Sequence, residues 1–193
     1  MLPSDAALSL ENRSRLPDAL RVLMTEFPRG GWQDNPRFEG LIRFWLERHM
    51  MFRGLLDAIE TDTHNVLDDK MDTARFAARL ARYGSIFVGE LHGHHSVEDA
   101  HYFPLLETFD ARLARGFSLL DADHHALDGH LQRFTEAVNA VLTSHGQADD
   151  MRVRTGEFDA VLQDLKSLLN RHLIDEEEIV VPVVLKYGGQ GLV

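Results

Sequence analysis

The sequence has no cysteine among its 193 residues. This absence excludes disulfide bonds, thiolate metal sites and cysteine nucleophiles. Long apolar runs are also missing: the longest clear one, residues 179–185, is far shorter than the roughly 20 residues that a helix needs to span a bilayer. The first residues lack a basic region followed by a long apolar stretch, which is the pattern of a secretory signal. We therefore expect a cytoplasmic protein.

Basic residues are scarce as well. The chain has 20 Lys and Arg against 31 Asp and Glu, which gives a formal net charge of −11. A negative surface repels phosphates, so nucleic acid and anionic membranes are excluded as expected partners. The sequence also shows no alternating strand pattern and no low-complexity linker. An all-α domain is the remaining prediction.

Histidine is abundant instead. There are 11 histidines, and they are dispersed along the chain rather than gathered in a purification tag. Hydrophobic residues make up 44% of the sequence, as is typical of one globular domain large enough to bury a core. This composition favours metal chemistry in a folded domain.

One stretch, RHLIDEEEIVVP at residues 171–182, combines a histidine with a carboxylate at helical spacing. His172 and Glu176 are four residues apart, so a helix places them on one face, one turn apart. The preceding turns carry an apolar stripe at helical period: Phe158, Val161, Leu162, Leu165, Leu168 and Leu169. His172 and Glu176 continue that stripe toward Ile179, so they occupy core positions. Buried imidazole and carboxylate groups are costly unless they are paired or bind a metal.

The same pattern occurs earlier in the chain. His94 and Glu98 repeat the four-residue spacing, and Pro104 follows His94 as Pro182 follows His172. Each copy also has a histidine upstream on an apolar stripe, at His49 and at His124. Two matched copies indicate two helical hairpins that each contribute one histidine and then a His-x-x-x-Glu pair.

The periodicity predicts a four-helix bundle of up-down-up-down topology with an N-terminal accessory helical segment. We expect the accessory segment at residues 1–34, with a short helix at 16–27 packed across the bundle as a strap. The bundle is predicted at 35–182 and a C-terminal tail at 183–193. Within the bundle the expected helices begin at 35, 71, 119 and 150 and end near 59, 106, 143 and 178, with turns at 60–69 and 144–150. For two of these helices alternatives stay open: Pro104 kinks or ends the second helix, and the fourth helix continues to the Pro182 region.

Facing helices of a bundle can project metal ligands inward. The inward set predicted here is His49, His94, Glu98, His124, His172 and Glu176. Imidazole and carboxylate without thiolate suit iron, manganese or zinc. Because the two glutamates come from different helices, each can bridge a pair of metal ions. The alternative is a bundle core with hydrogen-bonded histidines and no metal.

The remaining histidines have separate expectations. His101 shares the face of His94, as a seventh ligand or a hydrogen-bond donor to one. His95 and His125 follow predicted ligands on neighbouring faces, which is more typical of residues around a site or on the surface. His64 and His145 fall in predicted turns, and His92 and His130 are left undecided. Glu177 and Glu178 are expected on a solvated face.

On these residues the sequence resembles the hemerythrin-like family, whose domain is named for a His-His-Glu cation-binding pattern. The resemblance covers about residues 35–182. It implies a four-helix bundle with a non-haem di-iron centre, in which Glu98 and Glu176 bridge two iron ions and the four histidines are terminal ligands. Family roles include binding dioxygen, responding to oxygen or iron, and handling nitric oxide or peroxide.

The sequence departs from the oxygen carriers of that family at one position. Where they have a second histidine one turn after the third-helix ligand, this chain has Asp128. Reversible oxygen transport is therefore in doubt, and either Asp128 ligates or the position is open to water or substrate. The leading hypothesis is a di-iron protein that binds or senses dioxygen, nitric oxide, peroxide or iron.

Two alternatives stay open. One is a di-iron enzyme that reduces peroxide or nitric oxide or repairs damaged iron-sulfur clusters; the other is a structural module holding zinc. A small-molecule ligand is the expected partner, and formation of a homo-oligomer is left open.

Overall fold

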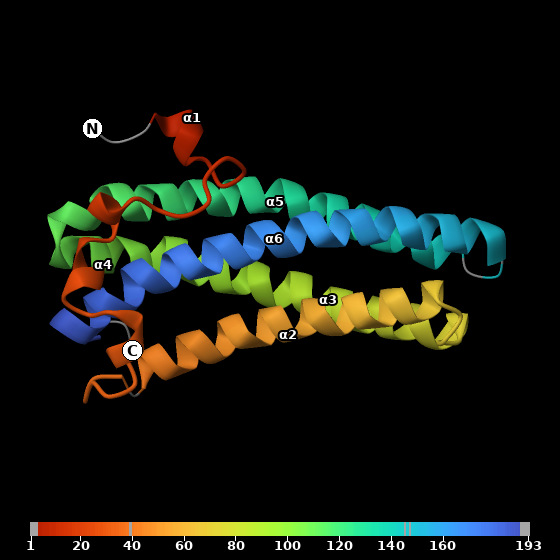
Figure 1. The fold of residues 1–193 in the computed structure, drawn as a ribbon, viewed down its shortest axis with the longest axis horizontal. Helices are drawn as coiled ribbons and strands as arrows, with labels where there is room; N and C mark the ends of the chain where they lie inside the picture. Colours follow the sequence, from red (N-terminus) through yellow and green to blue (C-terminus); the bar gives the residue numbers. More distant parts are fainter. Residues whose placement is uncertain (1–3, 39, 145, 147, 190–193) are drawn as a thin grey trace. The chain divides into compact units, whose positions relative to one another are not determined.

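The fold is built from helices (Figure 1). The computed structural model describes residues 4–38, 40–144, 146 and 148–189. The long helices are α2 (Leu41–Leu67), α3 (Thr73–Val97), α5 (Ala114–Thr143) and α6 (Ala148–Tyr187). The short elements are α1 (Asp5–Leu8), η1 (Asp18–Leu20), η2 (Val22–Thr25), η3 (Arg29–Gly31), the π-helical turn η4 (Glu98–Tyr102), α4 (Phe103–Phe109) and η5 (Ala111–Leu113). No strand occurs in this described part of the chain, which confirms the all-α prediction.

The chain divides into two compact units, and the long helices run through both. Unit 1 comprises Met1–His49, His94–Ala126 and Leu169–Val193; unit 2 comprises Met50–Gly93 and Leu127–Leu168. The chain enters unit 2 through α2, leaves through α3, enters again through α5 and leaves through α6. This order is the predicted up-down-up-down connectivity of a four-helix bundle. Within the described residues, none of the helices is long and apolar enough to cross a membrane.

Unit 2 has an aromatic core with one phenylalanine from each long helix. Phe52 and Phe87 meet edge to face at 6.4 Å between ring centroids. Phe87 and Phe134 are 5.6 Å apart, as are Phe134 and Phe158. All four side chains are buried. Such contacts each contribute roughly 0.5–1.5 kcal/mol beyond area burial, so they tie the four helical segments together.

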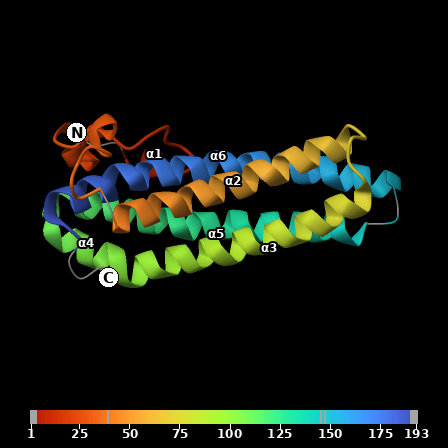
Figure 2. The same ribbon diagram turned by 90° about the horizontal axis from the view of Figure 1, so that it is seen from below.

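Residues 4–34 of unit 1, the N-terminal strap, pack against α5 and α6 (Figures 1 and 2). Five of the strap's apolar side chains are buried there, namely Leu8, Leu16, Leu20, Leu23 and Trp32. The approach is closest at Gly116 of α5, where a Cβ atom would lie 2.8 Å from Ile179 Cδ1 and 3.1 Å from the Leu20 carbonyl oxygen. The strap is thus packed closely against these helices.

The N-terminal boundaries differ from the predicted ones. The expected helix at residues 16–27 is two 3-10 turns, because Arg21 between them has a non-helical φ of −126° and ψ of 47°. Helix α2 begins at Leu41 rather than at residue 35, after Gly40 with its positive φ of 68°. The predicted turn at 60–69 is wrong as well: α2 continues to Leu67, since its polar stretch includes the fully buried Thr63.

Two further predictions, for the second helix and for the C-terminal tail, are wrong. The expected continuous helix at 71–106 is interrupted by the π-helical turn at Glu98. Helix α6 runs through Pro182 to Tyr187, so the predicted tail is helical at its start. The reason is burial, since Val183, Val184 and Leu185 belong to the core of unit 1 and their contacts outweigh the missing proline N–H. The end of that tail, residues 190–193, lies outside the described residues.

Candidate metal centre

All six predicted ligand residues belong to unit 1. They come from α2 (His49), α3 (His94), η4 (Glu98), α5 (His124) and α6 (His172 and Glu176). Five of the six side chains are at most 3% exposed, and that of His94 is 9% exposed. The apolar periodicity of the sequence therefore located them correctly in the core.

The histidines form two pairs with their Nε2 atoms facing each other. The distance between Nε2 atoms is 3.2 Å for His49 and His94, and 3.2 Å for His124 and His172. Two nitrogen ligands at right angles, each about 2.1 Å from one metal ion, lie about 3 Å apart. Each pair therefore has the spacing of adjacent ligands on a single ion.

The two glutamates lie between these pairs. Glu98 presents Oε1 to His94 Nε2 at 2.9 Å and Oε2 to His124 Nε2 at 3.6 Å. Glu176 presents a single oxygen, Oε2, to both sides: it is 3.4 Å from His49 Nε2 and 3.6 Å from His172 Nε2. Its other oxygen, Oε1, accepts a hydrogen bond of 2.7 Å from Trp45 Nε1. Each carboxylate thus reaches both histidine pairs.

The carboxylate oxygens that face the histidines lack hydrogen bonds. Within the described residues, both oxygens of Glu98 and Oε2 of Glu176 are buried without a hydrogen-bond partner. Native proteins rarely leave buried polar atoms in this condition, because each one costs about 1–3 kcal/mol. Cations placed between the glutamates and the histidines would satisfy all three oxygens, so the residues present fit a pair of metal ions.

The electrostatics of the cluster agree with that fit. Burial, together with the neighbouring Glu176, raises the pKa of Glu98 well above its usual range. Burial also opposes ionisation of Glu176, but the interactions with His49, His94 and His172 together outweigh it and lower the pKa of Glu176. Burial lowers the pKa of His94 to about 3, so its imidazole is neutral and can donate a lone pair at neutral pH.

Three carboxylates outside the cluster hold the other ring nitrogen of a histidine. Glu177 lies 3.0 Å from His49 Nδ1, Asp99 lies 2.7 Å from His124 Nδ1, and Asp123 lies 3.2 Å from His172 Nδ1. A carboxylate accepting from Nδ1–H fixes the tautomer whose Nε2 lone pair points toward the metal. Glu177 is buried, so the expectation of a solvated face is wrong for this residue.

His95 was expected around the site or on the surface, but it is buried inside the cluster. It is only 4% exposed, and among the described residues neither of its ring nitrogens has a hydrogen-bond partner. Its ring stacks on that of His124, and the ligand atoms of His95, His124 and His172 lie within 4.8 Å of one another. The doublet His94-His95 was a sequence signal, but adjacent residues on a helix face different directions, so periodicity placed only one of them inward.

The other candidates lie outside this cluster. His101 and Asp128 are exposed and belong to neither group of possible ligands in the described residues. The π-helical turn explains His101, because an extra residue in a helix rotates the residues after it by about 100°. His64, His92 and His125 are also exposed, and His130 is half-buried. His145 lies outside the described residues.

Comparison with known proteins gives one family. The hemerythrin HHE cation-binding domain matches residues 40–191. No curated protein and no solved structure matches the chain. The matched residues include both histidine pairs and both glutamates.

Proposed function

Since the chain belongs to the hemerythrin HHE cation-binding domain family, we propose that unit 1 holds two iron ions and uses them to bind and sense a small oxidant. Dioxygen, nitric oxide and peroxide are the ligands in question. Manganese or zinc also suits imidazole and carboxylate ligands. The observation that carries the proposal is the group of buried carboxylate oxygens that face two histidine pairs without hydrogen bonds.

We assign the ligands by distance. His49 and His94 hold the first ion, His124 and His172 hold the second, and Glu98 and Glu176 bridge the two. His95 joins the second ion, because it belongs to the same group of mutually close ligand atoms as His124 and His172. In this assignment His95 replaces the third-helix histidine that the chain lacks at Asp128.

A coordination count leaves room for one small ligand. Two octahedral ions offer about twelve positions, of which two bridging glutamates take about four and five histidines about five. A bridging solvent molecule takes about two more, so about one position stays open. Iron supplies reversible electron transfer together with that open position. A centre with one open position can bind an exogenous ligand, whereas a closed one is structural.

The surroundings restrict that ligand to a small one. Trp45 donates its indole N–H to Glu176, and its ring lies 5.0 Å from that of Tyr102 and 6.0 Å from that of His94. Phe103 stacks on His124, with ring centroids 5.4 Å apart. The Trp45 hydrogen bond orients the Glu176 carboxylate, and the aromatic rings leave little room beside the cluster for a large ligand.

A redox enzyme is the second candidate, and the contact between Trp45 and Tyr102 is the observation that favours it. Tryptophan and tyrosine side chains can each lose one electron, and here Trp45 bonds Glu176 while Tyr102 contacts Trp45. Tyr102→Phe, which keeps the ring contact, tests this reading. The enzyme predicts slower re-reduction of the oxidised iron by an external reductant at unchanged iron content, whereas a pure binding protein predicts no change.

Metal content is the primary test. The chain is expressed anaerobically with added iron, and elemental analysis is combined with an absorption spectrum of the fresh protein. We expect about two ions per chain and near-ultraviolet absorption that zinc cannot give. A fully helical protein with a metal content near zero would refute the proposal, and one ion per chain would refute the pairing.

A further inference from the structure

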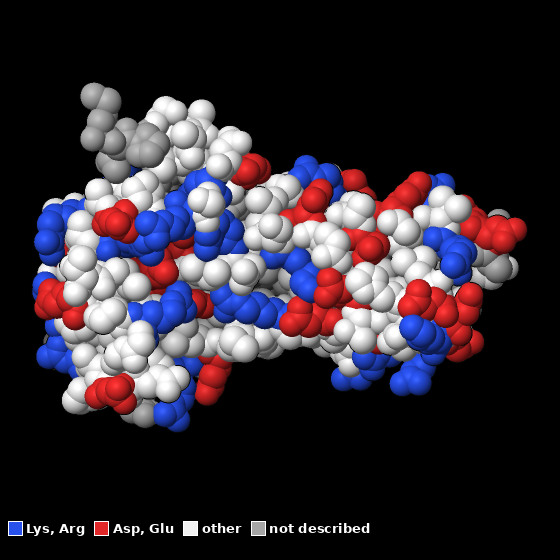
Figure 3. All heavy atoms as spheres, in the orientation of Figure 1, with Lys and Arg blue, Asp and Glu red and all other residues white. Residues whose placement is uncertain are grey.

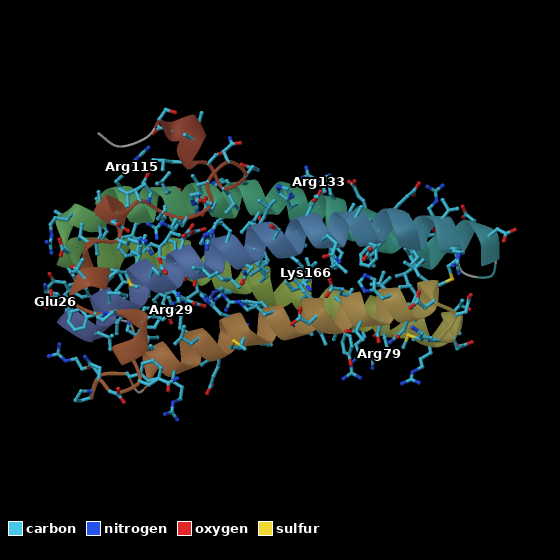
Figure 4. The ribbon with its side chains drawn as sticks, in the orientation of Figure 1. Glu26, Arg29, Arg79, Arg115, Arg133 and Lys166 are labelled. Carbon is cyan, nitrogen blue, oxygen red and sulfur yellow. The ribbon has the colours of Figure 1, made fainter. Side chains whose placement is uncertain are left out.

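The N-terminal strap supplies two arginines to the carboxylates behind the metal-facing histidines. Arg29 lies on the strap beside α6 (Figure 4), and its Nη1 is 2.7 Å from Glu177 Oε2. The other oxygen of Glu177 is 3.0 Å from His49 Nδ1. An unbroken chain of contacts therefore runs from Arg29 through Glu177 to His49.

Arg13 makes the equivalent chain on the other histidine pair. Its guanidinium is buried and forms a two-pronged ion pair with Asp123, whose Oδ2 is 3.2 Å from His172 Nδ1. Arg13 Nε also bonds Asp175 at 2.9 Å, and Nη1 bonds the Leu8 carbonyl at 2.9 Å. The strap thus reaches one histidine of each pair through one arginine and one carboxylate.

The strap contacts of Arg13 and Arg29 differ from the exposed ion pairs on the surface because their carboxylate partners are buried. Strap and helix carry interspersed basic and acidic side chains (Figure 3), and the exposed pair Arg115–Asp5 also links the strap to α5. By contrast, the Glu177 side chain is 5% exposed and those of Asp123 and Arg13 are 3% and 2% exposed. The Arg13–Asp123 pair is therefore buried at both ends, whereas the Arg29–Glu177 pair is buried only at its carboxylate, since Arg29 is 44% exposed. Buried charges are screened little by solvent, so a change at the arginine alters the field at the carboxylate and its histidine.

We propose that Arg13 and Arg29 are positioning residues of the metal centre, through which the docked strap sets the electron donation of His172 and His49. This inference rests on the proposed metal-binding function. A carboxylate that accepts from Nδ1–H makes the imidazole a stronger donor to the metal. An arginine on the far side of that carboxylate draws charge away from it and weakens the effect. The strap therefore holds the centre at a higher reduction potential than the histidines and carboxylates alone would give.

His124 provides an internal reference. Its partner Asp99 is 33% exposed and forms no ion pair with an arginine or lysine in the described part of the chain. Changes to the strap should therefore leave His124 as it is while they alter His49 and His172. A merely structural strap would disturb all three histidines together.

Arg21 provides a matched control on the same strap. It pairs with Glu178 of α6, the neighbour of Glu177, but no histidine contact of Glu178 occurs among the described residues. Arg21→Gln thus removes a strap–helix ion pair and one positive charge without touching a metal-facing histidine. Arg29→Gln removes the corresponding pair at Glu177 together with a longer contact of 3.9 Å to Glu178. The Arg29 side chain is 44% exposed, so the variant should fold.

The decisive experiment measures the histidines directly. The full chain is loaded with zinc, labelled with nitrogen-15 at histidine and compared by NMR with its variants. Arg29→Gln should shift the Nδ1 resonance of His49 and leave His124 in place, whereas Arg21→Gln should shift neither. In the iron-loaded protein, Arg29→Gln should lower the midpoint potential, both because His49 donates more strongly and because a nearby positive charge is lost.

The possible outcomes separate the two proposals. Equal shifts in Arg29→Gln and Arg21→Gln, or none in either, would overturn the role of the strap while metal binding stands. A wild-type chain that binds no metal would overturn the proposed function and this inference together. Arg13→Lys, which keeps a positive charge beside Asp123 but loses the planar two-pronged contact, is the second variant and should shift His172 alone.

Discussion

The rings of His95 and His124 are stacked, with centroids 3.9 Å apart and planes inclined by 9°. Burial lowers the pKa of His95 well below its usual range, so its ring is neutral at physiological pH. A neutral His95 has a nitrogen lone pair available for a cation beside His124. The pair therefore extends the candidate centre by a residue that the His-x-x-x-Glu repeat does not contain.

Replacement of His95 should weaken one of the two metal positions. His95→Ala removes a ligand of the second ion, so we expect the metal content to fall from about two ions per chain toward one. His125→Ala is the control, because His125 is an exposed histidine one position after His124 on the same helix. Elemental analysis after dialysis measures both variants. Equal metal content in wild type and His95→Ala would show that the second ion does not use this residue.

The four predicted histidines should behave differently from an exposed one. Replacing His49, His94, His124 or His172 by Ala is expected to reduce metal content, since each side chain faces the glutamates. His64→Ala should not, because His64 is exposed on α2. Metal analysis and circular dichroism on all five proteins test this assignment. A similar loss of metal in His64→Ala would indicate that misfolding, rather than ligand removal, explains the result.

Glu98 should destabilise the metal-free protein although it is needed for metal binding. Because burial raises its pKa, ionising it in the metal-free fold is unfavourable, and this cost grows as the pH rises above about 4.5, where the unfolded side chain ionises. Glu98→Gln should lose metal but stabilise the metal-free protein by about 1–3 kcal/mol at pH 7. Urea unfolding of both metal-free proteins measures it, with the exposed Glu107→Gln as control. A metal-free variant less stable than wild type would contradict the argument.

Acid should destabilise the metal-free protein through His94. Its folded pKa is about 3, whereas an unfolded histidine has a pKa of about 6.5. The unfolded chain therefore binds the proton first, and stability falls as the pH drops from about 6.5 toward about 3, by up to about 1.4 kcal/mol per pH unit. Urea midpoints at pH 7, 6 and 5 for wild type and His94→Gln isolate this contribution. Parallel pH profiles of the two proteins would rule it out.

Close packing of the strap predicts opposite effects for two glycines of α5. A methyl group at Gly116 would overlap Ile179 and approach the Leu20 carbonyl, so Gly116→Ala should destabilise the protein by about 1–3 kcal/mol. Gly129 has no atom within 4 Å of its Cβ position, so Gly129→Ala should stabilise the helix by about 0.5–1 kcal/mol. Thermal unfolding of both variants tests the contrast, and a stabilised Gly116→Ala protein would mean that the strap does not dock there.

Small ligands should reach the metal. With about one coordination position open, azide or nitric oxide is expected to bind iron directly and change its absorption spectrum. Titration of the reduced and oxidised protein measures this, and zinc-loaded protein is the silent control. Spectra that stay unchanged at saturating ligand in both states would mean a closed site. The protein would then be a structural metal-binding module, and neither a sensor nor an enzyme.

The sequence by itself determined the fold class and most of the candidate site. Apolar residues at helical period specify amphipathic helices, and that same period identified His49, His94, Glu98, His124, His172 and Glu176 as core positions. Helix ends were less accurately predicted. Helix α6 continues through Val183–Leu185 because these residues are buried in the core, whereas α2 begins only after Gly40, which adopts a positive φ.

Only the tertiary structure decided which other residues join the cluster. His94 and His101 are seven residues apart and would share a face of a regular helix, yet His101 is exposed, because a π-helical turn changes the register between them. His95 is buried although the apolar period does not include it. Arg13 and Arg29 lie far from the histidine pattern along the chain, and no local period links a strap to α5 and α6. Their contacts with Asp123 and Glu177 arise from packing of distant segments, which a one-dimensional pattern does not encode.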